Sequence, residues 1–329
     1  MTPATGRQPD TLASIYEPIQ SEMAQVEWLI EEKLATADAL LEPVIAAAQR
    51  YRGKRLRPAL VLLTARSHGR VTDQHIAAAA AVELLHNASL MHDDVIDAAE
   101  MRRQCASMNR TWGDEITIVV GDFFFAAFLE ALGEVRQPAA SAAIARCVRE
   151  LCTGELTQLV RRGQVDVSES EYLAIAEHKT AALLAAACEA AAHISAAPAA
   201  PHAAFGRKLG VAFQIIDDCL DFAGSEHAAG KSLGSDLFTV KLTLPAIYLL
   251  EAVPPALRRE TVELLTTAAT PYDRRRVADL MNEFGTLATA RATAHRIITE
   301  AKCALDPLPQ GTCKDALITL ADYVLDRSG

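Results

Sequence analysis

The chain has 329 residues, of which half are hydrophobic and only 5% aromatic, and its formal net charge is -10. An acidic balance of this size disfavours a general nucleic-acid-binding surface, so we expect no nucleic acid among its partners. The length fits either one large domain or two.

The cysteine usage indicates a reducing compartment. There are seven cysteines, an odd number without a Cys-x-x-Cys pair, and the first residues lack the pattern of a secretory signal. We therefore expect a cytoplasmic protein without disulfides or a zinc site. We also expect no transmembrane helix, because Asp122 interrupts the apolar run 116–132 and Glu189 interrupts the Ala-rich run around it. Peripheral membrane contact is expected only through a lipophilic product.

Apolar residues recur at helical spacing along most of the chain. Residues 1–11 lack this periodicity and are predicted to be disordered. Helices are predicted over 12–41 with a break near Pro18, 43–51, 59–67, 76–97, 116–132, 139–160, 172–197, 205–222, from 243 onward, 256–268, 272–305 with a break, and 312–327. We find no strand–helix alternation and no glycine-rich nucleotide loop. The predicted fold class is all-α, a single large helical bundle over 12–329 around a central apolar cavity.

Three carboxylates interrupt the apolar helix 76–97 near its end. Asp93 and Asp97 lie four residues apart and share a helix face, and Asp94 lies beside them. Buried anions cost several kcal/mol each unless they are paired or coordinated, which favours a site for divalent metal. A solvated helix end, where acids gather by chance, is the alternative for this motif alone.

The same Asp-Asp-x-x-Asp pattern returns at Asp217, Asp218 and Asp221, 124 positions further along and again at the end of an apolar helix. Two chance occurrences in matching contexts are much less probable than one. Hard oxygen ligands without paired His or Cys favour magnesium, which commonly coordinates phosphate oxygens as well. The two motifs hint at two similar halves, but no repeat extends beyond them.

Basic residues cluster beside these acids despite the acidic composition. Residues 52–58 hold four cations around a glycine and read as an anion-binding turn or, alternatively, as an ordinary solvated loop. His86 lies two turns before Asp93 on nearly the same face, although a lone histidine is more often a core residue. The candidate diphosphate-binding cations are Lys54, Arg57, Arg102, Arg103, Lys179, Lys231 and Lys241. This inventory fits two polyphosphate groups above a cavity for a hydrocarbon.

From about residue 12 to 327 the chain resembles the trans-isoprenyl diphosphate synthases, or polyprenyl synthetases, and within them the long-chain enzymes. The resembling segments are Gly53-Lys54-Arg55-Leu56-Arg57-Pro58, Glu83-Leu84-Leu85-His86, His92-Asp93-Asp94-Val95-Ile96-Asp97, Arg102-Arg103, Gly121-Asp122, Lys179-Thr180, Phe213-Gln214-Ile215-Ile216-Asp217-Asp218 and Lys241-Leu242-Thr243-Leu244-Pro245. The resemblance implies the type I isoprenoid synthase fold, a homodimer, and condensation of isopentenyl diphosphate with an allylic diphosphate.

The resemblance also implies roles for individual residues. Three magnesium ions would bind the allylic diphosphate through Asp93, Asp97, Asp217 and Asp221, helped by Asp94 and Asp218. Arg102, Lys179, Lys231 and Lys241 would hold the leaving group, and Gly53, Lys54, Arg57, His86 and Arg103 would hold isopentenyl diphosphate. Thr180 and Gln214 would present oxygens to the allylic cation, and the released diphosphate would remove the final proton. Such electrostatic stabilisation requires a site closed to water.

Three positions depart from the family pattern, since Arg52, Gln104 and Val240 stand where glycine is usual. No charged ligand is lost, so we expect activity to survive.

The small residues Ala88 and Ser89, about one turn before Asp93, predict product length. In the family a bulky aromatic residue there gives a short product, so a product longer than C20 is predicted, from a farnesyl or geranylgeranyl primer. The alternatives are a short-chain (C15 or C20) synthase, a non-catalytic partner subunit of a heteromeric synthase, and a terpene cyclase, which would lack the second diphosphate site.

Overall fold

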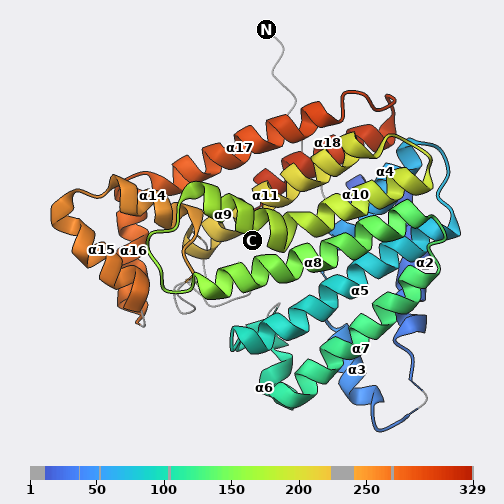
Figure 1. The fold of residues 1–329 in the computed structure, drawn as a ribbon, viewed down its shortest axis with the longest axis horizontal. Helices are drawn as coiled ribbons and strands as arrows, with labels where there is room; N and C mark the ends of the chain where they lie inside the picture. The colour runs from blue at the N-terminus through green and yellow to red at the C-terminus, as the bar shows by residue number, and fades with distance from the viewer. Residues whose placement is uncertain are drawn as a thin grey trace.

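The computed structural model describes residues 12–36, 38–51, 53–102, 105–223, 241–267 and 270–327. Most of them are helical, as the sequence predicts (Figure 1). The elements are α1 (Leu12–Tyr16), the 3-10 turn η1 (Glu17–Ile19), α2 (Gln20–Lys33), α3 (Glu42–Gln49), α4 (Leu56–Ser67), α5 (Asp73–Ile96), β1 (Met101–Arg102), β2 (Cys105–Ala106), α6 (Met108–Trp112), α7 (Asp114–Gly133), α8 (Pro138–Val160), α9 (Glu169–Ala176), the π-helical turn η2 (Glu177–Ala181), α10 (Ala182–Ile194), α11 (Ala199–Ala223), α14 (Leu244–Ala252), α15 (Pro255–Thr267), α16 (Pro271–Glu283), α17 (Thr286–Ala304) and α18 (Thr312–Leu325).

The predicted all-α class is confirmed, and most predicted helices occur within a few residues of their expected ends. The first helix is broken at Pro18 by η1, as expected, but α2 ends at Lys33 and not near residue 41. The pairing of β1 with β2, in which Arg102 lies opposite Cys105, was not foreseen. Two-residue strands are too short for a period-2 pattern to reveal them. Residues 1–11, predicted to be disordered, lie outside the described residues.

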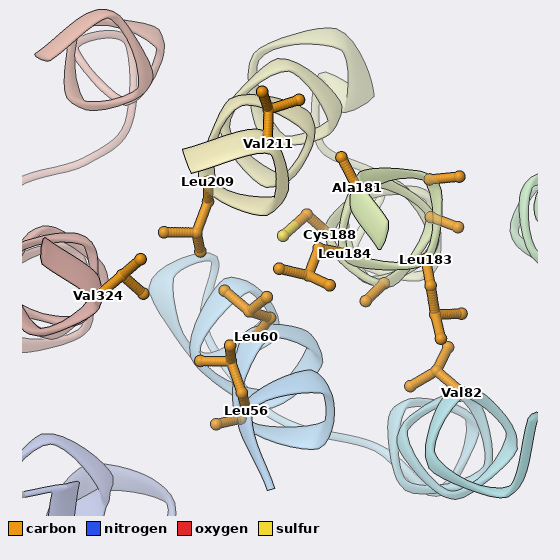
Figure 2. Packing of buried hydrophobic residues seen from close by; sticks show 14 of the residues in the cluster. Leu56, Leu60, Val82, Ala181, Leu183, Leu184, Cys188, Leu209, Val211 and Val324 are labelled. Atoms are coloured by element: carbon orange, nitrogen blue, oxygen red, sulfur yellow. The ribbon is translucent and has the colours of Figure 1, made fainter. Parts of the chain in front are cut away.

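Helix α10 occupies the centre of the bundle and contacts α4, α5, α8 and α11 (Figure 1). Its Ala-rich sequence is almost wholly buried, because small side chains let neighbouring helices approach on every side. Figure 2 shows Leu184 and Cys188 of α10 meeting Leu60 of α4 and Leu209 of α11. One hydrophobic cluster runs from Ile15 to residues of α18. The single domain over 12–329 stays a prediction.

Two glycines bring the neighbouring helices against η2. A Cβ atom at Gly154 of α8 would lie 2.6 Å from the amide nitrogen of Lys179, and one at Gly210 of α11 would lie 2.4 Å from the Cα of Ala181. Real Cβ atoms essentially never approach so closely. The two glycines therefore fix the position of the turn that carries Lys179 and Thr180.

Arg55 lies inside the protein and not in a solvated basic turn. It adopts the left-handed conformation (φ 52°), donates to Glu27 of α2, and donates through Nη1 to Glu83 of α5 over 2.7 Å. Because the Glu83 side chain is only 2% exposed, removal of Arg55 would leave a buried charge unpaired, at a cost of about 3–5 kcal/mol. This cluster joins α2, α4 and α5.

Among the described residues, one helix is long and apolar enough to cross a membrane by length and composition alone, namely α7. The core helix of a soluble protein passes the same test. One face of α7, with Phe124 and Phe128, is buried in the bundle, and the helix packs along α5. Its other face exposes large apolar side chains, Val119 most of all at 65%.

Candidate active site

The two acidic motifs face a common cavity of about 630 Å³ at one end of the bundle. Its walls come from the end of α5, the β1 segment, η2, α11 and the residues just before α14. The predicted site residues that line it are Asp93, Asp97, Arg102, Lys179, Thr180, Gln214, Asp217, Asp218 and Lys241. Segments nearly 150 positions apart in sequence are thus brought together, as the sequence predicts.

The second aspartate of each motif is held by a tyrosine. The Tyr51 hydroxyl donates to Asp94 over 3.1 Å, and the Tyr172 hydroxyl donates to Asp218 over 2.5 Å. Asp94 is fully buried and also accepts from Arg102, while Asp218 is 4% exposed. Burial raises the pKa of Asp94, and Arg102 opposes this effect. In this arrangement Asp94 orients Arg102 and lies behind the cavity wall.

Lys179 and Thr180 lie in the π-helical turn η2, an irregularity that is frequent at functional sites. Thr180 donates to Gln214 over 2.6 Å, and the Gln214 amide donates to Asp218 over 2.7 Å. This chain of hydrogen bonds joins η2 to the second motif. It fixes the two oxygens that were predicted to face the allylic cation.

Lys179 reaches across to α8. It donates to Gln158 over 2.8 Å and pairs with Glu155, whose other carboxylate oxygen is buried without a hydrogen-bond partner. The pKa of Asp93 is raised to about 6, mainly by burial; Lys179 lowers this pKa, and the nearby Glu155 and Asp97 raise it. Lys179 thus interacts with both of these acids, Asp93 and Glu155.

Asp97 is held by two cations. Lys241 donates to its Oδ2 over 2.7 Å, and Arg162 donates to its Oδ1 over 3.1 Å. On the opposite wall, Arg327 near the end of α18 lies 3.4 Å from Asp217 and stacks on the ring of Phe213, 4.2 Å from its centroid. Protein cations thus pair with Asp97 of the first motif and Asp217 of the second.

The residues predicted to bind isopentenyl diphosphate do not line this cavity. Lys54 lies 5.8 Å from the ring centroid of Tyr323, Arg57 is in the first turn of α4, and His86 is partly buried on α5. Asp221, 8% exposed, is also absent from the lining, as are Gly53, Ala88 and Ser89. Arg103 and Lys231 lie outside the described residues. The roles of these residues stay predictions.

Five residues that contact the site belong to none of the sequence motifs, namely Tyr51, Gln158, Arg162, Tyr172 and Arg327. Each contacts a site residue more than 20 positions away, so no local pattern marks the pairing. The Arg161-Arg162 pair after α8, in an acidic chain, was the one available signal.

Within the described residues, no three carboxylate, imidazole or thiol groups converge closely enough to cage a metal ion. Magnesium is commonly bound by one or two carboxylates together with waters and substrate phosphates, so the separated acids of this cavity fit that ion. The donor set on both walls is oxygen only.

We predict that Asp93→Asn stabilises the metal-free protein above pH 6. Because the folded-state pKa of Asp93 is raised from 3.8 to about 6, the unfolded chain releases this proton first, so the free energy of unfolding falls as pH rises toward 6. The substitution should raise that free energy by about 1–3 kcal/mol at pH 8 and by less at pH 5.

Urea denaturation in chelator at both pH values measures the difference. Asp166→Asn, at an exposed position, is the control and should change little. An equal gain at pH 5 and pH 8, or no gain, would contradict the electrostatic origin.

A model of the polyprenyl synthetase family matches residues 38–284. Heptaprenyl diphosphate synthase component 2 of Geobacillus stearothermophilus is 32% identical over 323 residues, 96% of this chain and 99% of that protein. Octaprenyl diphosphate synthase of Escherichia coli K12 is 31% identical, with the same coverage. A polyprenyl synthase of Caulobacter crescentus CB15, solved with calcium and isoprenyl diphosphate, matches with a TM-score of 0.93 and 32% identity over 98% of this chain and 100% of that one. The chain belongs to the polyprenyl synthetase family and is a prenyltransferase.

Proposed function

We propose that the chain is a magnesium-dependent trans-prenyltransferase. It condenses isopentenyl diphosphate with an allylic diphosphate, farnesyl or geranylgeranyl, and releases an all-trans polyprenyl diphosphate of medium or long chain. The observation that carries this proposal is the cavity in which Asp93 and Asp97 face Asp217, with Lys179 and Lys241 on its walls. Such a site attracts a polyanion that arrives with divalent cations.

Magnesium would be held by Asp93, Asp97 and Asp217, with Asp221 adjacent, and three ions per site follow from the family resemblance. When bound, it supplies Lewis-acid stabilisation of the departing diphosphate. The raised pKa of Asp93 and the buried, unpaired oxygen of Glu155 support this assignment, because a divalent cation would stabilise the charged form of these two buried carboxylates.

The cations of the cavity would bind the diphosphate leaving group. Lys179, Lys241 and Arg102, the last oriented by Asp94, bind diphosphate oxygens as the allylic carbon–oxygen bond breaks. Thr180 and Gln214 then direct oxygens toward the carbocation. The departing diphosphate accepts the final proton, so no side-chain base is needed.

The second substrate would bind beside this cavity. Lys54, Arg57 and His86, with Gly53 and Arg103, form the isopentenyl diphosphate site in our proposal, since all follow motifs shared with the family. A terpene cyclase needs no such second site. Consumption of isopentenyl diphosphate distinguishes the two reactions.

A product longer than C20, about C40, follows from Ala88 and Ser89 and from the large apolar interior. A short-chain synthase of the same family is the alternative. A second alternative is a subunit that acts only with a partner chain, because one relative is named component 2 of a heptaprenyl diphosphate synthase.

We also propose a cytoplasmic homodimer. All seven cysteines are free thiols, which suits a reducing compartment. Exposed apolar side chains on α7 and α8, among them Val119, Leu156 and Val160, offer a surface that a second copy would cover.

Purified protein given farnesyl diphosphate, isopentenyl diphosphate and magnesium should form products longer than C20, seen by chromatography. The double variant Asp93→Ala/Asp97→Ala should fold yet lose condensation by several orders of magnitude, because two metal ligands are gone. A sole C15 or C20 product refutes the open tunnel. Near-normal turnover of the variant refutes the metal site, and turnover only with an added chain supports the partner-subunit alternative.

We predict that Ser89→Phe shortens the product. Ser89 is partly buried on α5 one turn before Asp93, so an aromatic ring there would obstruct a growing chain below the metal site. The product distribution should shift toward C15–C20 with the rate of the first condensation retained. Thr299→Phe, at an exposed position on α17, is the control. An unchanged distribution would place the growing chain elsewhere.

We predict that Leu156→Glu weakens self-association. This side chain is 63% exposed on α8, and a charge inside an apolar contact between copies costs several kcal/mol. Light scattering across a dilution series should show a dimer for the original protein and a larger monomer fraction for the variant. Tyr272→Glu, at a 76% exposed position on α16, should keep the original profile. Equal profiles for both variants would exclude α8 from the interface.

A further inference from the structure

Asp97, the last acid of the first motif, has both carboxylate oxygens occupied by cations from different segments. Lys241 precedes α14 and takes Oδ2, whereas Arg162 follows α8 and takes Oδ1. Lys241 lines the cavity together with Asp97, but Arg162 does not. The two cations therefore bind different oxygens of Asp97, and of the two only Lys241 lines the cavity.

The turn after α8 aims Arg162 at this carboxylate. The Arg162 amide donates to the carbonyl of Leu159 over 3.2 Å, and Gly163 takes a left-handed conformation (φ 80°) that favours glycine. The neighbouring Arg161 points elsewhere and bonds to Gln164 and Glu171. Only one arginine of the pair thus reaches the acidic motif.

We propose that Arg162 is a positioning residue for metal binding. It holds Asp97 by Oδ1, so that Oδ2 stays directed into the cavity when Lys241 transfers from Asp97 to the substrate diphosphate. The cavity position of Lys241 allows that transfer, while the position of Arg162 keeps it on Asp97. The inference rests on the proposed function, since it assumes that magnesium and diphosphate occupy this cavity.

Without Arg162 the Asp97 carboxylate is free to rotate once Lys241 leaves it. Groups that orient a metal ligand commonly contribute 10- to 100-fold to metal affinity. Loss of Arg162 should therefore weaken magnesium binding more than it weakens catalysis by the loaded enzyme.

The test is calorimetric titration of inorganic diphosphate at a series of magnesium concentrations, with steady-state kinetics alongside. Arg162→Gln should raise the half-saturating magnesium concentration about tenfold, with kcat largely restored at saturating magnesium. Arg162→Lys should recover part of the difference. Arg161→Gln is the matched control and should titrate like the original protein.

Two results would overturn the inference. One is a magnesium dependence of Arg162→Gln within twofold of the original. The other is weaker diphosphate binding at every magnesium concentration without a shift of the half-saturating value, which would make Arg162 a direct diphosphate ligand. If the original protein itself shows no magnesium-dependent diphosphate binding, the proposed function fails, and the inference fails with it.

Discussion

Mutual repulsion of carboxylates at one end of the bundle is the constraint that the rest of the site must satisfy. Asp93 already has a raised pKa because burial and its acidic neighbours disfavour its charge. Asp97 and Asp217 pair with cations from distant segments, Asp97 with Lys241 and Asp217 with Arg327. These cations offset part of the repulsion, and those that line the cavity can also pair with a diphosphate.

The buried acids of the two motifs depend on partners that the helix packing brings to them. The tyrosines that hold Asp94 and Asp218 come from different parts of the bundle, Tyr51 from the segment after α3 and Tyr172 from α9. A buried carboxylate needs such partners, because desolvation without them costs several kcal/mol. The second acid of each motif is consequently anchored by the bundle next to the first acid, Asp93 or Asp217, which lines the cavity.

The small residues of the core also determine the geometry of the site. Ala-rich α10 and the close contacts of Gly154 and Gly210 bring α8 and α11 against η2, so that Thr180 reaches Gln214. Larger side chains at these glycines would push the π-helical turn away from the second motif. Close helix packing therefore determines the position of η2 and, with it, the hydrogen bond between Thr180 and Gln214.

The sequence by itself determined the helical class, most helix boundaries and the presence of two acidic motifs, because apolar periodicity and charge pattern are local properties. It could not reveal η2, the β1–β2 pair or the inward position of Arg55, since each depends on contacts with distant segments. Only the tertiary structure decided which acids of each motif line the cavity and which cations pair with them. The reason is that burial and pairing of a charge depend on what the fold places beside it, as for Asp97 between Arg162 and Lys241.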